Sequence, residues 1–75
     1  MDYRKYITID SGTRSGKPCI KGSRITVGDV LDYLAAGMSV ERIIREHRNL
    51  TEEGIRAALA YAADIQRRLA TGTLV

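Results

Sequence analysis

The segment GKPCIKGSRITVGDVLDYLAAG, residues 16–37, contains the signals that decide the fold. Its first half alternates short apolar pairs with glycine and basic residues, whereas its second half repeats apolar residues at helical spacing. The change falls at Thr26, whose hydroxyl can accept hydrogen bonds from the unpaired N–H groups of a first helical turn. Asp29 follows three residues later, which gives an aspartate version of the capping box. We therefore expect a β-ribbon to end and a helix to begin at Thr26.

Ser39 and Thr51 mark two more helix starts, because each has an apolar residue directly before it and another four positions after it. This pattern is the hydrophobic staple, which fixes how a chain enters a helix. Gly37 stands where a left-handed residue would end the first helix, and Gly72 is expected to close the last. The sequence thus predicts three helices, at about 27–36, 40–47 and 52–70.

Apolar stripes predict which faces of these helices are buried. In the first helix the expected core residues are Val27, Val30, Leu31, Leu34 and Ala35. In the third they are Ile55, Ala58, Leu59, Ala62, Ile65 and Leu69. The third helix is also rich in alanine, which allows a second packing face around Ala57, Tyr61 and Ile65. The alternative explanation for the alanines is that alanine is the best helix former.

Before Thr26 the apolar residues alternate as they do in strands. We expect one short strand at 6–9 and a hairpin with legs at 18–20 and 24–26, with Gly22 at positive φ in its turn. Such a small sheet is marginal alone, and the single cysteine excludes a disulfide within the 75-residue chain. Because so short a chain buries a small core, we expect a homodimer that pairs through the N-terminal β segment.

The chain is expected to form one domain, 1–75, with a β-ribbon region (1–25) and a three-helix region (26–75). Its positive charge is uneven: residues 1–28 carry six basic and two acidic side chains, whereas residues 29–75 carry six and seven. A basic first segment suggests a polyanion or an acidic partner surface, although it could equally serve solubility alone. No apolar run approaches the roughly 20 residues of a membrane span, so we expect a cytoplasmic protein.

Several kinds of chemistry are excluded by residue type and spacing. Between Gly12 and Gly16 lie three residues, where a phosphate-binding loop needs four, and Pro18 stands in place of the required hydroxyl. One cysteine and one histidine cannot complete a zinc site. His47 is expected to end the second helix, and Cys19 to pack as a small hydrophobe. We therefore expect no catalytic residue, no metal and no cofactor.

Three segments, 16–27, 34–39 and 50–53, resemble the domain-of-unknown-function family numbered 433. Its pattern reads roughly GKPxIxGTRITV, LxxGxSxEEI and LTxExIxAAL, and the likeness covers nearly the whole chain. The resemblance implies a mainly α, homeodomain-like three-helix domain, similar to a helix-turn-helix, after a short N-terminal strand and a hairpin. Members of this family look like antitoxins of bacterial toxin–antitoxin pairs, often beside a PIN-type ribonuclease. The chain departs from the pattern at Cys19, Ser23 and 47–48.

Two functions follow as hypotheses, and the first is a DNA-binding antitoxin. The last helix of a helix-turn-helix enters the major groove, but Glu52 and Glu53 face phosphates badly there, which leaves Arg56 to read a base edge. A two-stranded ribbon fits the major groove as well as a helix does. We therefore expect DNA contacts from the basic ribbon, at Arg14, Lys17, Lys21 and Arg24.

The second hypothesis is a protein-interaction module that inhibits a ribonuclease without touching DNA. A metal-dependent nuclease site is a cluster of carboxylates, which a plugging cation complements. The candidate toxin contacts are Arg67 and Arg68, with the apolar 74–75 tail as an anchor. Their alternative role is that of a solvated helix end, where cations suit the helix dipole.

Overall fold

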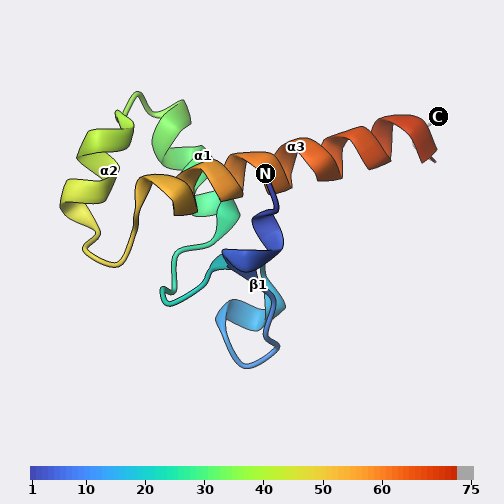
Figure 1. The fold of residues 1–75 in the computed structure, drawn as a ribbon, viewed down its shortest axis with the longest axis horizontal. Coiled ribbons are helices and arrows are strands. Elements are labelled where there is room, and N and C mark those ends of the chain that lie inside the picture. Colours follow the sequence, from blue (N-terminus) through green and yellow to red (C-terminus); the bar gives the residue numbers. More distant parts are fainter. Residues whose placement is uncertain (73–75) are drawn as a thin grey trace.

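The computed structural model describes residues 1–72 of the chain. Most of them are helical: α1 spans Val27–Ala35, α2 Val40–Glu46 and α3 Glu52–Gly72. The N-terminal part contains two 3₁₀-helical turns, η1 (Tyr3–Lys5) and η2 (Arg14–Gly16), and two short strands, β1 (Ile7–Thr8) and β2 (Cys19–Ile20). In Figure 1, α1 and α2 lie around the first half of α3, and the second half extends beyond them. The predicted three helices and small N-terminal sheet are confirmed.

Each helix begins directly after the residue whose side chain was expected to cap it. Thr26 Oγ1 accepts a hydrogen bond from the Asp29 backbone N–H at 2.9 Å, and Asp29 Oδ2 accepts one from the Thr26 backbone N–H at 3.0 Å. This is the reciprocal capping box. Ser39 and Thr51 each accept from the backbone N–H three residues later, at 3.1 and 3.0 Å. All three predicted N-caps are confirmed.

The core lies where the first half of α3 meets α1, α2 and β2. Its buried members are Ile20, Val27, Val30, Ile43, Leu50, Ile55 and Ala58. Gly54 in the first turn of α3 lets that helix approach the sheet, since a Cβ atom there would lie 3.2 Å from Ile20 Cγ2. Ile20 is 4 % exposed, so β2 is packed directly beneath the helices.

The sheet differs from the expected hairpin. β2 pairs antiparallel with β1, with Ile7 opposite Ile20 and Thr8 opposite Cys19. The expected second strand of the hairpin, 24–26, forms only a single β-bridge, between Cys19 and Thr26. The reason is that the chain turns tightly after β2, where Ser23 N–H donates to the Ile20 carbonyl at 3.0 Å, and then enters α1 at once. Gly22 in this turn has φ +82°, as predicted.

The predicted burial of α3 is wrong at Leu59 and beyond the midpoint of the helix. Leu59, Ile65 and Leu69 are 40, 36 and 46 % exposed, and Leu31 of α1, also expected inside, is 38 % exposed. α3 has 21 residues and is therefore about 31 Å long. α1 and α2 have nine and seven residues and cannot cover it. A regular apolar pattern thus continues past the point where the chain's own core ends.

We predict that glycine substitutions will separate backbone strain from packing. Gly22 and Gly37 have φ of +82° and +95°, with no atom within 4 Å of an added Cβ. Gly22→Val or Gly37→Val should therefore destabilise the fold by about 1 kcal/mol or more through backbone strain alone. The control is Gly28→Ala in α1, which meets only an ordinary 3.7 Å contact with Thr26 Oγ1 and should stabilise by about 0.5–1 kcal/mol. Equal melting temperatures for all variants would contradict these turn assignments.

Candidate functional site

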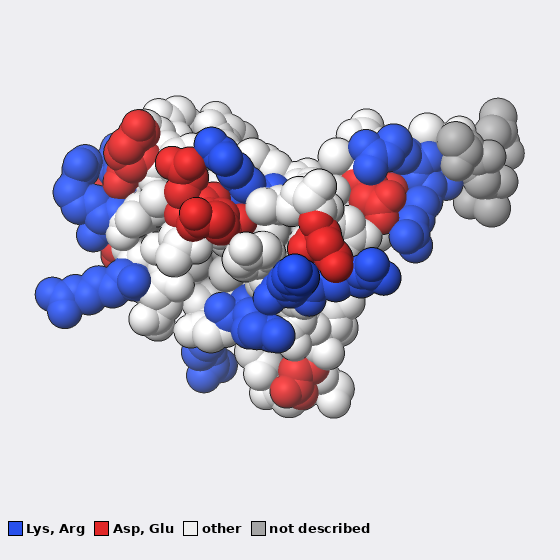
Figure 2. Space-filling model, in the orientation of Figure 1, with Lys and Arg blue, Asp and Glu red and all other residues white. Residues whose placement is uncertain are grey.

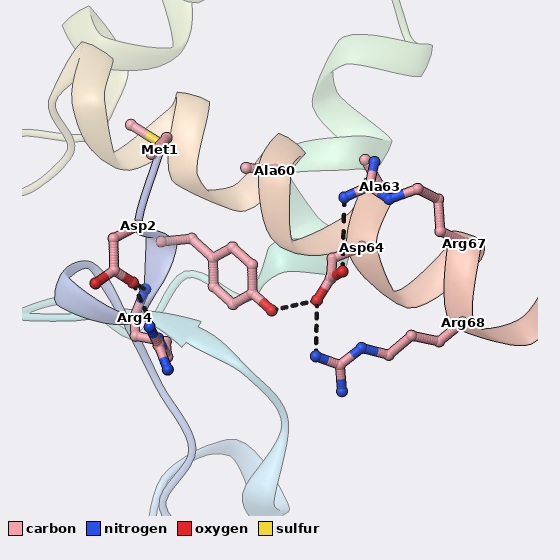
Figure 3. A pocket seen from close by; sticks show the side chains of 9 residues that line it. Met1, Asp2, Arg4, Ala60, Ala63, Asp64, Arg67 and Arg68 are labelled. Atoms are coloured by element: carbon pink, nitrogen blue, oxygen red, sulfur yellow. Dashed lines mark hydrogen bonds and ion pairs between the residues drawn. The ribbon is translucent and has the colours of Figure 1, made fainter.

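An open groove lies between η1 and the second half of α3 (Figure 3). Its volume is about 660 Å³. The α3 side has the small side chains of Ala60 and Ala63, which leave room above the helix. The polar lining residues are Asp2, the N-cap of η1, with Tyr3 and Arg4 of η1, and Asp64, Arg67 and Arg68 from α3.

Tyr3 joins the two sides of this groove. Its hydroxyl donates a hydrogen bond to Asp64 Oδ2 at 2.5 Å, across 61 positions of sequence. Its ring also meets the ring of Tyr61 edge-on, with centroids 5.4 Å apart and planes at 85°, a favourable geometry for an aromatic pair. The second packing face expected on α3 is therefore occupied by η1 at Tyr61. Ala57 is fully buried, whereas Ile65 is 36 % exposed.

Asp64 is the centre of the charged contacts in the groove. Arg68 Nη2 lies 3.1 Å from Oδ2, and Arg67 Nη2 lies 3.5 Å from Oδ1. The hydrogen bond from Tyr3 lowers the pKa of Asp64, and the charges of Arg68 and Arg67 act in the same direction against desolvation. Asp64 is thus held as a carboxylate. It positions two guanidinium groups whose side chains remain 70 and 72 % exposed.

The opposite side of the groove is organised in a similar way. Asp2 caps η1 by accepting from the Arg4 backbone N–H at 3.1 Å, and it also accepts from Arg4 Nε at 3.0 Å. The groove therefore has three arginines against two aspartates, a net charge of +1. In Figure 2, basic side chains lie beside acidic ones over the N-terminal segment and over the second half of α3. This face can bind an acidic group between pre-positioned guanidinium groups.

The four ribbon residues predicted to bind a partner do not form one equivalent set. Arg14 is engaged within the chain, because its Nη1 donates to the Arg24 carbonyl at 2.8 Å and pairs with Asp29 Oδ2 at 3.2 Å. Arg14 and Ser15 have φ of +49° and +60°, and these bonds help to hold that unusual backbone. The side chains of Lys17, Lys21 and Arg24 are exposed.

Other predicted residues have local structural partners. Arg56 Nη2 lies 2.9 Å from Glu52 Oε1 in the first turns of α3, with its side chain 69 % exposed. His47 ends α2 and stacks on Tyr33 at 5.1 Å. Cys19 is 1 % exposed and packs as a small hydrophobe. These positions confirm the structural predictions made for His47 and Cys19.

The search for metal-binding and membrane features covers residues 1–72. Within them, no three His, Cys, Asp or Glu side chains gather into a group that could hold a metal ion. No helix in this part of the chain combines the length and the apolar character needed to cross a bilayer.

The groove was missed from sequence because its parts lie at opposite ends of the chain. Arg67 and Arg68 were identified as candidates, but their partner Asp64 was not. The signal was present, since Asp64 precedes them by three and four positions, the spacing of neighbours on one helix face. Tyr3 and Arg4 had no such local signal.

We predict that Tyr3→Phe will raise the pKa of Asp64, because it removes the hydrogen bond that lowers this pKa most. A carboxyl whose pKa is depressed by folding stabilises the fold above its unfolded pKa, and this stabilisation is lost as pH falls through the folded pKa. The variant should therefore lose less stability than the wild type on acidification below the ordinary value of 3.8. Carboxyl NMR titration measures the pKa directly, with Tyr33→Phe as the control. An unchanged Asp64 titration in Tyr3→Phe would contradict the assigned hydrogen bond.

Comparison with known proteins agrees with this architecture. Residues 7–62, which include both strands, α1, α2 and the first half of α3, match the family described as "Protein of unknown function (DUF433)". The uncharacterized protein y4eO of Sinorhizobium fredii is 39% identical over 59 residues, 79% of this chain but only 27% of that protein. A crystal structure of a DUF433 member protein from Anabaena variabilis is similar, with a TM-score of 0.71 and 28% identity over 87% of this chain and 68% of that one. The chain is therefore a member of the DUF433 family.

Proposed function

We propose that this chain is an antitoxin of a toxin–antitoxin pair that binds and neutralises a PIN-like ribonuclease. The proposal starts from the resemblance of its glycine, proline and cap motifs to antitoxins of this family. One structural observation supports it: Arg67 and Arg68 stand together on the projecting half of α3, both paired with Asp64 at the groove. Guanidinium groups complement the carboxylate cluster of a metal-dependent nuclease, because they bind carboxylates in bidentate pairs.

Replacing Asp64 as the partner of Arg67 and Arg68 costs little free energy. Exposed ion pairs contribute little to stability, and the side chains of Arg67 and Arg68 are about 70 % exposed. Asp64 therefore holds the two cations in place without binding them tightly. In the proposed complex, carboxylates of the ribonuclease replace Asp64 as their partners.

The shape of the chain also favours α3 over the ribbon as the ribonuclease-binding element. The second half of α3 projects beyond α1 and α2 (Figure 1), so a concave partner surface can receive it as a helix in a groove. Asp64, Arg67 and Arg68 lie beyond residue 62, where the family match ends. The apolar residues 74–75, expected to act as an anchor, lie outside the described residues.

We predict that the double variant Arg67→Ala/Arg68→Ala will bind the proposed PIN-like ribonuclease partner about tenfold more weakly or worse, a change of at least 1.4 kcal/mol. Calorimetric titration of the purified proteins measures this, and co-expression tests whether the variant still relieves toxicity. The matched control is Arg42→Ala/Arg45→Ala, which removes two exposed arginines from α2. Equal affinity for both double variants would reject α3 as the inhibitory element.

The second candidate function is DNA binding by a homeodomain-like arrangement of α2 and α3. Its alternative is a dimeric interaction module that does not bind DNA. The exposed side chains of Lys17, Lys21 and Arg24 favour contact through the ribbon. The acidic side chains of Glu52 and Glu53 in the first turn disfavour contact with phosphates through the start of α3. A gel mobility shift on the chain's own promoter DNA across a salt series separates the two, because phosphate contacts weaken steeply with salt. Binding that ignores salt, or that survives Lys21→Glu unchanged, would exclude the ribbon.

A further inference from the structure

β1 is the outer strand of the sheet, and its outer edge can accept another strand. Antiparallel strands alternate between residue pairs that exchange hydrogen bonds and pairs whose backbone groups point away from each other. Ile7 lies opposite Ile20, and Ile20 donates its N–H to the Ile25 carbonyl on the other side of β2, at 2.9 Å. The neighbouring pair is bonded, since Lys21 N–H donates to the Tyr6 carbonyl at 2.7 Å. The N–H and C=O groups of Ile7 therefore point to the outer edge.

The residues of this edge favour pairing with a further strand. Natural edge strands are protected by lysine, proline or a bulge, whereas residues 7–9 read Ile-Thr-Ile. Ile7 packs against the core. Ile9 directly follows β1, and its position two residues later places it on the same face of the strand, yet it is 60 % exposed. The apolar face of the strand thus continues one residue past the chain's own core.

We infer that two copies of this chain associate edge to edge, with their β1 strands antiparallel about a two-fold axis at Thr8. In this register Ile7 of one copy lies opposite Ile9 of the other, and each such pair exchanges both of its N–H···O bonds. The two Thr8 residues face each other as a pair without hydrogen bonds, because their backbone groups point to β2. The pairing extends β1 to Ile9 and converts two marginal two-stranded ribbons into one four-stranded sheet.

A second copy fits this edge because the segment is complementary to itself in this register. Each Ile9 side chain lies beside Ile7 of the other copy, on the face that packs against the core, and is thereby removed from water. Lys5 precedes the paired segment and Asp10 follows it, and both are exposed. Antiparallel pairing brings each Lys5 near Asp10 of the other copy, whereas parallel pairing would bring like charges together. Charge therefore favours the antiparallel arrangement.

This inference gives the homodimer expected from the sequence an edge and a register. It does not depend on the proposed antitoxin function, because residues 7–9 do not line the groove between η1 and α3. A chain that fails to dimerise would leave the predicted ribonuclease contact at Arg67 and Arg68 unaffected, so the two proposals can fail separately.

Disulfide trapping tests the register. Thr8→Cys places one thiol from each copy at the two-fold axis, where the Cα atoms of a pair without hydrogen bonds lie about 4.5 Å apart, within reach of a disulfide. The variant is made together with Cys19→Ala, because Cys19 lies opposite Thr8 on β2 and would compete for the new thiol. Oxidation of the full chain should convert this variant to a covalent dimer on non-reducing gels.

The control for trapping is Thr13→Cys in the same Cys19→Ala background. Thr13 is half-buried, like Thr8, but lies in the loop after β1, so this variant should remain monomeric. Absence of a cross-link at position 8, or equal cross-linking at positions 8 and 13, would overturn the inferred register.

Sedimentation equilibrium tests the interface without introducing a bond. The wild type should show a concentration-dependent dimer. Ile9→Lys should be monomeric, because a charge on an edge strand opposes pairing, and its melting temperature in dilute solution should change little, because Ile9 is 60 % exposed. Leu69→Lys is the matched control: it adds the same charge at an apolar residue that is 46 % exposed but lies on α3, and it should remain dimeric. A monomeric wild type, or an Ile9→Lys variant that dimerises as well as Leu69→Lys, would reject the β1 interface.

Discussion

The reciprocal hydrogen bonds between Thr26 and Asp29 are the contact on which the rest of the structure depends. Thr26 is 4 % exposed and forms the single bridge to Cys19 of β2, so the start of α1 is fixed to the sheet. Arg14 connects the loop between the strands to this junction, since it binds both Asp29 and the Arg24 carbonyl. The backbone bond from Thr26 is the main cause of the lowered pKa of Asp29. One capped junction therefore joins the loop, the ribbon and the first helix.

Because α3 is longer than the other helices, its first half belongs to the core and its second half is largely exposed. Its first half has Gly54 against β2 and Ile55 and Ala58 in the core. Its second half is held against η1 through the hydrogen bond of Tyr3 to Asp64. Different faces of that half then have different character: the groove face holds cations on Asp64, and the face with Ile65 and Leu69 is apolar and exposed. A single helix can in this way present two independent surfaces.

The sequence was sufficient for the features that depend on local chemistry. Three cap residues, a glycine turn at Gly22 and the helix bounds follow from backbone hydrogen bonding and φ preferences, which act over a few residues. Features that depend on contacts between distant segments could not be predicted from the sequence. The pairing of β2 with β1 instead of a hairpin leg depends on how tightly the chain turns after Ile20. The contact of Tyr3 with Asp64 spans 61 positions. The burial of Leu69 was mispredicted because periodicity shows which face is apolar but not whether anything covers it.

The contact of Tyr3 with Asp64 and Tyr61 has a consequence for the thermodynamics of association. A lone helical segment of some ten residues is only marginally ordered in water, and ordering it at the moment of binding subtracts from affinity. Here the N-terminal turn restrains the middle of that segment in advance, so its conformational entropy is already lost in the unliganded chain. Binding of the proposed ribonuclease by this helix would thereby be closer to docking of a rigid body than to coupled folding and binding.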